Sequence, residues 1–312
     1  MNAYFARNNA LTGTLTDVSD ARTINDVLDL AGLDWQVDLR DLYFRVSGGI
    51  TVGVEVPNQY AVVRGDITPL GVVGQRYTPI QNHDAFAPLA YLEAEGFISG
   101  YEQAGMLGDG QRVFVIATLA EEMRLVDKHH ARILFSTTHD GSGAFSVHAM
   151  IQRLHCANQI PRLREQGKSL GISIRHTQSA EQRISQVKHR VMEEMRWIEE
   201  YEAGYQRLLD TPIDRGHSHM AAGFVNMLAP IPSGPRVTDR MIRAAERKQQ
   251  DLHARIHSKA NENIQGTMAA LFQGAVEYSD YDARGNNAER ILLGRDIEFK
   301  RQAWDLALTL SA

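Results

Sequence analysis

The feature that most constrains the fold is a change of hydrophobic period near Ser179. Before this position, apolar residues alternate with polar ones in short runs that end at glycine, proline or Asp-Gly pairs, the pattern of β-strands and tight turns. After it, apolar residues recur every three to four positions, as in amphipathic helices. We therefore expect an α+β chain in which a β-rich part precedes a helical part.

Two Asp-Gly pairs, Asp109-Gly110 and Asp140-Gly141, lie between apolar runs, and each predicts a β-hairpin. The runs YAVVRGD and LGVVGQRYTPI add two earlier strands, and a glycine inside such a run often marks a bulge or a close backbone approach. The segment NHDAFAPLAYLEAEG predicts a helix with Asn82 as its N-cap. The expected order is β-β-α-β-β-β-β in an antiparallel sheet core, followed by long C-terminal helices.

The chain divides into three predicted parts. Residues 1–48 read as an N-terminal arm with a short helix over 24–31, capped by Thr23, and a strand over 35–46. Residues 49–178 form the β-rich core domain. Residues 179–312 form a helical region that opens with a helix of roughly 30 residues, in which Ser179 and Gln182 suggest a capping box. A later polar helix is predicted to begin at Thr238 or Asp239.

Composition limits the environment of the protein. The 312 residues include 33 basic and 38 acidic side chains, for a net charge of −5, and the hydrophobic content of 43% is that of a globular protein. A single cysteine excludes an internal disulfide and is typical of a reducing compartment. The N-terminus has no signal-peptide pattern, and no apolar run approaches the roughly 20 residues that span a bilayer. We expect a cytoplasmic protein without a membrane segment.

The stretch 137–163 contains the only cysteine, Cys156, and raises the question of a catalytic or metal site. The histidines near it in the sequence are His139, His148 and His155. However, the chain lacks CxxC, HExxH, GxxxxGK[ST] and GxSxG motifs. We interpret Cys156 as a structural residue in an apolar run and assign no catalytic residue, metal or cofactor. If the chain were an enzyme, Asp140, His139 and His148 around the second hairpin turn would be the first residues to test.

A basic segment follows the last predicted strand. Between residues 151 and 190 the chain has eight lysines and arginines but only two acidic residues, a net charge of +6 that leaves −11 for the rest. Such asymmetry can direct an anionic partner to one face, although a solvated loop and helix start is the alternative. The predicted phosphate-binding residues are Arg153, Arg162, Arg164, Lys168 and Arg175, and the aromatic residues predicted to stack on unpaired bases are Tyr77 and Tyr101.

Several motifs occur in an order that resembles a known family. They are LGVVGQRYTPIQNHDAF, YEQAGMLGDGQRVFVIATL, FSTTHDGSGAFSVHAMIQRLHCANQI, IRHT and TMAALFQGAVEYSDYDARGNNAER. Together they resemble the phage- and plasmid-type family of unknown function numbered 932, from about Val62 to the C-terminus. The family usually has R-V-V-C-x-N-T-L where this chain has RLHCANQI. Arg153, Cys156 and Asn158 therefore match, whereas Gln159 replaces a threonine and its hydroxyl.

The predicted order of elements is also similar to the core of single-strand annealing recombinases of the RecT, Red-beta and Rad type. That resemblance implies rings or filaments that hold single-stranded DNA in a basic groove by non-covalent binding to phosphates. We therefore expect a single-stranded-DNA-binding protein of mobile elements, acting in annealing or recombination in the cytoplasm of a bacterial host. The alternatives are a protein-interaction module, such as a host-defence inhibitor or a scaffold, and a metal-dependent nuclease.

Overall fold

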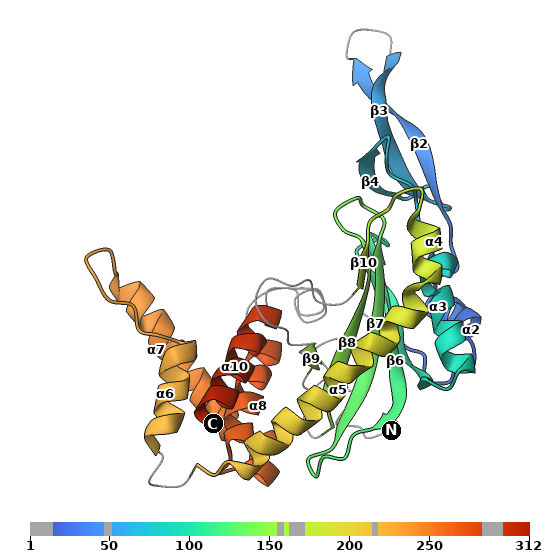
Figure 1. Cartoon of the computed structure of the whole chain (residues 1–312). Helices are drawn as coiled ribbons and strands as arrows, with labels where there is room; N and C mark the ends of the chain where they lie inside the picture. The colour runs from blue at the N-terminus through green and yellow to red at the C-terminus, as the bar shows by residue number, and fades with distance from the viewer. Residues whose placement is uncertain (1–14, 47–51, 155–158, 162–171, 214–217, 283–295) are drawn as a thin grey trace.

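The computed structural model describes residues 15–46, 52–154, 159–161, 172–213, 218–282 and 296–312. These residues form an α+β fold with two antiparallel sheets (Figure 1). Helices pack on the larger sheet, and further helices lie beside its lower half, on the left in Figure 1. The smaller sheet projects from the opposite end. The predicted class, an antiparallel β-rich part followed by helices, is confirmed.

The larger sheet has seven strands in the order β1-β5-β6-β7-β8-β10, with β9 paired to β8. Both predicted hairpins are present, because β5 pairs with β6 and β7 with β8 on either side of the two Asp-Gly turns. Gly110 and Gly141 have φ values of 115° and 77°, which other residues rarely adopt. The bounds are β1 (Leu15–Asp17), β5 (Ile98–Leu107), β6 (Arg112–Glu122), β7 (His129–Thr138), β8 (Phe145–Arg153), β9 (Gln159–Pro161) and β10 (Ile172–Ile174).

The smaller sheet consists of β2 (Val37–Val46), β3 (Val52–Arg64) and β4 (Pro69–Gly74), in that order. The prediction of one sheet is therefore wrong, since the two strands before the first core helix, β3 and β4, form this separate sheet with β2 and do not pair with the later hairpins. β4 pairs with only the 59–63 stretch of β3, so the distal part of the β2–β3 hairpin is a ribbon of two strands. In Figure 1 this ribbon projects away from the rest of the chain.

The predicted N-terminal arm is integrated into the fold where the structure describes it. β1 pairs with β5 of the larger sheet, and β2 belongs to the smaller sheet. Between them, α2 (Ile24–Leu30) begins with the predicted Thr23, whose side chain accepts from the Asp26 N–H in a full capping box. Val27 and Leu28 of this helix are buried in the main core.

Helices α3 (Asn82–Ala94), α4 (Ala180–Ser185) and α5 (Val187–Asp210) pack along the larger sheet, and α5 continues past it (Figure 1). Two predicted caps are wrong. Gln81 is the N-cap of α3, because Asn82 is buried and its amide instead donates to the Leu33 carbonyl at 2.8 Å. Ser179 makes no side-chain capping bond, and the expected long helix is divided at Gln186.

The C-terminal helices pack on the distal part of α5. Tyr201 stacks on Trp304 with 4.9 Å between ring centroids, and Phe272 meets the same tryptophan edge-on. Thr238 caps α7 as predicted. No described helix is both long enough and apolar enough to cross a membrane. The elements are α6 (Ser218–Leu228), α7 (Asp239–Ile256), the 3₁₀ helix η2 (Lys259–Ile264), α8 (Met268–Tyr281) and α10 (Asp296–Leu310).

Candidate functional site

A groove of about 1140 Å³ lies where the β7–β8 turn meets the smaller sheet. Its lining comes from β4 and the residues after it (72–77), from the turn (141–144), and from β10 with the residues that follow it (173 and 175–177). Asn58 and Gln59 of β3 complete it. These segments belong to three of the motifs singled out in the sequence, GQRYTP, DGSG and IRHT, which are far apart in the chain. The fold thus brings separate motifs to one open surface.

Glycine makes the close approach of the two sheets possible. A Cβ atom at Gly71 in β4 would lie only 2.6 Å from the Asp140 Cα and 2.7 Å from its carbonyl oxygen. A Cβ atom at Gly141 would lie 2.8 Å from a methyl carbon of Val73. The expected close backbone approach is therefore present at Gly71. Asp140 itself forms the turn, because its carboxylate accepts from both the backbone N–H and the hydroxyl of Ser142.

Two arginines supply positive charge to the groove. Arg76 follows β4 and Arg175 follows β10, and both side chains are exposed groove-lining residues. Neither forms an ion pair with another residue that the structure describes. Arginine presents several N–H groups in a planar fork that matches phosphate oxygens. The predicted site residue Arg175 therefore lies in the groove, together with Arg76, which the sequence did not single out.

Tyr77, another predicted site residue, forms part of the groove wall. Its ring stacks on His176 with centroids 5.0 Å apart and planes only 5° from parallel. Its hydroxyl lies 3.4 Å from the Thr138 carbonyl oxygen, and burial raises the pKa of the phenol. One face of the tyrosine ring is thus occupied by His176, so a stacking role for Tyr77 is limited to the other face.

Behind this wall lies a second histidine, His139, which is fully buried. Its Nε2 lies 2.9 Å from Asn82 Oδ1, and since the Asn82 amide nitrogen donates to Leu33, this oxygen accepts. Nε2 therefore holds the proton and Nδ1 is left as an unprotonated acceptor. Burial, with the nearby His176, lowers the pKa of His139 to about 3, and burial lowers that of His176 to about 4. Both rings are neutral at pH 7.

Several buried polar atoms at this junction have no hydrogen-bond partner among the described residues. They are Trp35 Nε1, Thr138 Oγ1, His139 Nδ1 and His176 Nδ1. The rings lie together, with Trp35 5.2 Å and His176 6.5 Å from the His139 centroid. An unpaired buried polar group costs about 1–3 kcal/mol. The contact between the sheets is therefore polar and less stable than the apolar core beneath it.

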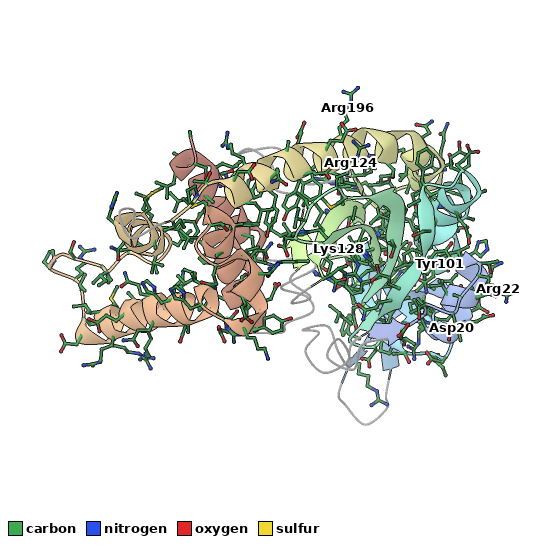
Figure 2. The ribbon with its side chains drawn as sticks, turned by 90° about the horizontal axis from the view of Figure 1, so that it is seen from below. Asp20, Arg22, Tyr101, Arg124, Lys128 and Arg196 are labelled. Atoms are coloured by element: carbon green, nitrogen blue, oxygen red, sulfur yellow. The ribbon has the colours of Figure 1, made fainter. Side chains whose placement is uncertain are left out.

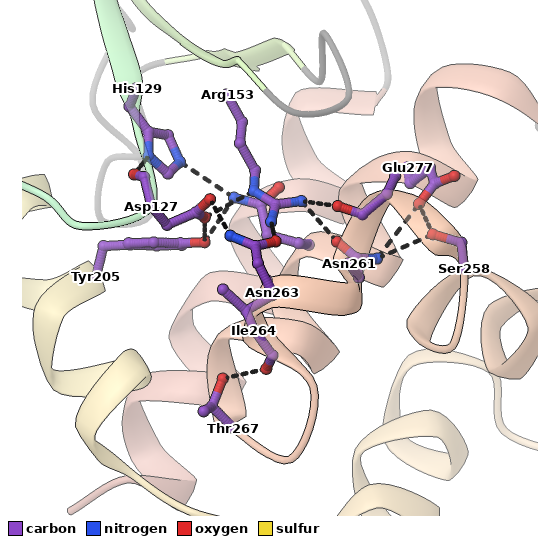
Figure 3. Close-up of polar contacts among 12 residues, drawn as sticks. Asp127, His129, Arg153, Tyr205, Ser258, Asn261, Asn263, Ile264, Thr267 and Glu277 are labelled. Atoms are coloured by element: carbon purple, nitrogen blue, oxygen red, sulfur yellow. Dashed lines mark hydrogen bonds and ion pairs between the residues drawn. The ribbon is translucent and has the colours of Figure 1, made fainter.

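Arg153 does not reach this groove. It is fully buried, and its guanidinium donates to Asp127 at 2.7 Å, to Asn261 at 2.7 Å and to Asn263 at 2.8 Å (Figure 3). Tyr205 also donates to Asp127, at 2.6 Å. Burial alone would raise the pKa of Asp127, but the bonds from Arg153 and Tyr205 outweigh it and the pKa is lowered. This position does not fit the prediction that Arg153 binds phosphate; the residue joins β8 to the C-terminal helices.

Tyr101 is also removed from solvent. Only 3% of its surface is exposed, and its hydroxyl donates to Glu93 of α3 at 3.1 Å (Figure 2). Its ring belongs to the main core, so this position does not fit the predicted stacking on bases. Sequence alone placed Tyr101 beside polar residues and glycine, but it did not show which face of β5 points inward.

The remaining predicted residues give less information about the site. Arg162, Arg164, Lys168 and Cys156 lie outside the described residues, as does His155. Burial lowers the pKa of His148 to about 4. Within the described part of the chain, no three histidine, cysteine, aspartate or glutamate side chains come together as a metal site would require. Asp140, His139 and His148 are therefore not brought together as metal ligands.

The groove residues missed from the sequence had a weak signal. Arg76 stands inside the quoted run LGVVGQRYTPI, next to Tyr77, but its run was interpreted only as a strand. The glycines of the DGSG turn were assigned to a hairpin, which is correct, but not to a surface. The fold is needed to relate these motifs to one another, because only the structure shows that the three of them line the same groove.

Comparison with known proteins gives one result. The model of the family described as a domain of unknown function, DUF932, matches residues 69–304. The match includes all three groove motifs and the Arg153 network. No curated protein and no solved structure matches the chain.

Proposed function

Since the chain belongs to the DUF932 family, whose description assigns no activity, its function has to be inferred from its own site, and we propose that it binds single-stranded DNA in the groove between its two sheets. One observation carries the proposal. Three separate motifs meet at an open groove that holds two arginines without ion-pair partners among the described residues. The expected binding is to phosphates, because the groove offers positive charge and no deep pocket for one base.

The groove has the size and lining of a site for an extended polar ligand. Pockets for drug-sized molecules are typically about 300–1,000 Å³ and mostly apolar, whereas this groove exceeds that range and is lined largely by polar residues and glycines. Gly141 and Gly143 have no side chains that would keep a strand away from the turn. Tyr77, which is partly exposed, adds an aromatic side chain to the same lining. Such a combination of charge and an aromatic platform is common in single-strand binding.

We propose annealing of complementary strands as the use of this binding, in the replication or recombination of phage and plasmid DNA in the bacterial cytoplasm. The suggestion comes from the predicted order of elements, which resembles that of single-strand annealing recombinases, although the structure places the first two of those strands in a separate sheet. Association into a ring or filament, with Arg162, Arg164 and Lys168 extending the basic surface, is part of the same proposal. These three residues lie in the stretch 162–168 before β10, and β10 leads to Arg175.

Fluorescence anisotropy of a labelled single-stranded oligonucleotide tests the proposal. Binding should weaken steeply with salt, with a slope of about 0.7 in log–log units for each phosphate contact. Arg76→Glu and Arg175→Glu should each lower the affinity and reduce that slope. Duplex DNA of the same length should bind less tightly, and a strand-pairing assay with two complementary oligonucleotides then tests annealing.

A matched control distinguishes binding at the groove from binding through the positive charge of the whole surface. Arg196 is exposed on α5, where it points away from the ribbon (Figure 2), and it is not among the residues that line the groove. Arg196→Glu changes the net charge by the same amount as each groove variant. Its affinity should stay within about twofold of the unmodified chain, since it makes no phosphate contact. The proposal fails if no binding occurs at low salt, or if Arg196→Glu weakens binding as much as the groove variants do.

A further inference from the structure

The outer edge of β2 carries exposed aromatic side chains on a projecting ribbon. Over residues 52–58 of β3 and the part of β2 that pairs with them, no further described strand pairs with the ribbon on either side. Tyr43 is 56% exposed and Phe44 53% exposed, and Val54, which lies opposite Phe44, is 40% exposed. An isolated two-stranded hairpin is only marginally stable in water, and an open edge presents unpaired backbone groups. The ribbon has the features of a surface that pairs with another strand.

The outer edge of β2 is regular where the ribbon begins. Between the pairs Asp41↔Tyr60 and Tyr43↔Glu55, β2 contributes one residue and β3 contributes four. The extra length therefore bulges from β3, where Asn58 has a φ of 60°, and β2 alternates without interruption. Leu42 and Phe44 share one face, and Asp41, Tyr43 and Arg45 share the other. Neither Asp41 nor Arg45 forms an ion pair with a described residue.

The sequence of this stretch, Asp41-Leu42-Tyr43-Phe44-Arg45, is complementary to itself when read antiparallel. A two-fold axis normal to the sheet relates two β2 strands without turning the sheet over, so side chains on one face of the first strand lie on the same face of the second. Residues that lie opposite each other therefore always belong to the same face. An axis at Tyr43 places Asp41 opposite Arg45, Leu42 opposite Phe44, and the two Tyr43 rings opposite each other. Axes at Asp41 or Arg45 put like charges opposite, and axes at Leu42 or Phe44 separate the carboxylate from the guanidinium. One register thus satisfies every pair.

We propose that β2 pairs antiparallel with β2 of a second copy of this chain, centred on Tyr43, so that the two smaller sheets become one. Both ends of the paired stretch then gain a cross-strand ion pair, and Leu42, Phe44 and Val54 of both copies form one apolar patch. The partner is a second copy because charge and apolar pairing match only in the self-antiparallel arrangement. The groove remains open, since it is lined by β4 at the opposite edge of the smaller sheet.

Disulfide trapping tests the register directly. In a Cys156→Ser background, which removes the only natural cysteine, Tyr43→Cys places two thiols directly opposite each other, where Cβ atoms are about 4.5–5.5 Å apart. Mild oxidation should then give a covalent dimer. Asp41→Cys and Arg45→Cys should not cross-link alone, but a mixture of the two chains should. Equal cross-linking by all three single variants, or none by Tyr43→Cys, overturns the proposal.

Charge reversal gives an independent test by sedimentation velocity. Asp41→Arg or Arg45→Asp alone puts like charges opposite at both ends and should weaken the dimer about tenfold or more. The double variant Asp41→Arg/Arg45→Asp restores opposite charges and should recover the dimer. Asp38→Arg, on the same strand outside the paired stretch, is the control and should change nothing. A monomer at all concentrations, or a double variant no better than the single ones, refutes the pairing whether or not the chain binds DNA.

Discussion

Replacing Gly71 with alanine should disturb the contact between the two sheets. The new methyl group would lie 2.6, 2.7 and 2.9 Å from three backbone atoms of Asp140, whereas carbon atoms in ordinary contact are about 3.5–4.0 Å apart. The turn must therefore move by roughly 1 Å, and because these are backbone atoms, no side-chain rotation can relieve the contact. Overpacking of this kind typically costs about 1–3 kcal/mol. We expect Gly71→Ala to fall in the upper half of this range.

Gly74, in the same strand, is the matched control. A Cβ atom there would have nothing within 4 Å, so Gly74→Ala should be neutral or stabilising by up to about 1 kcal/mol through the unfolded state. Urea unfolding followed by circular dichroism gives both free energies. Single-strand binding should also fall in Gly71→Ala, because the moved turn lines the groove, although both groove arginines are intact. Free energies of unfolding that agree within 0.5 kcal/mol for the two variants would refute the reasoning.

Three further predictions concern the buried polar groups. Arg153→Met should lower the free energy of unfolding by about 3–5 kcal/mol in urea titrations, because it leaves the Asp127 carboxylate buried without its cation. The free energy of unfolding should fall as the pH drops from about 6.5 toward 4, because histidines are protonated in the unfolded chain over this range, whereas His139 and His176 in the folded chain have pKa values of about 3 and about 4. Urea midpoints across this range check the sign, and His176→Gln should make the free energy depend less on pH. Tyr101→Phe should leave single-strand affinity unchanged in the anisotropy assay, since its ring lies in the core; a large loss would return this residue to the binding surface.

Local signals in the sequence predicted individual elements well. Each Asp-Gly turn carries its own information, because the flanking alternation and the need for positive φ are both encoded within a few residues. The same holds for Thr23 and Thr238, whose hydroxyls cap the helices that follow them. Ser179 shows the limit, since its backbone is not extended as a capping residue requires, and its side chain makes no cap.

The arrangement of the strands and the burial of single residues could not be predicted in the same way. A period of two identifies a strand but not its neighbour, so the division into two sheets depends on contacts between distant segments. Arg153 looked like a member of a basic surface because its partners, Asp127, Asn261 and Asn263, lie elsewhere in the chain. Two groove residues, Arg175 and Tyr77, were predicted as site residues from the sequence. The groove itself was not, because the contact between β4 and the Asp140 turn joins segments that are far apart in the chain.

The network around Arg153 also has a consequence for how this chain can be divided. Its hydrogen bonds to Asn261 and Asn263 join residues 108 and 110 positions apart, and the bond from Asn263 to Asp127 spans 136. Closing such long loops costs chain entropy before any contact forms, so this network belongs to a late step of folding. A fragment that ends near residue 179 would retain the Arg153–Asp127 pair without the amides that complete it. We therefore expect the β-rich part and the C-terminal helices to unfold together, and a fragment truncated between them to be unstable.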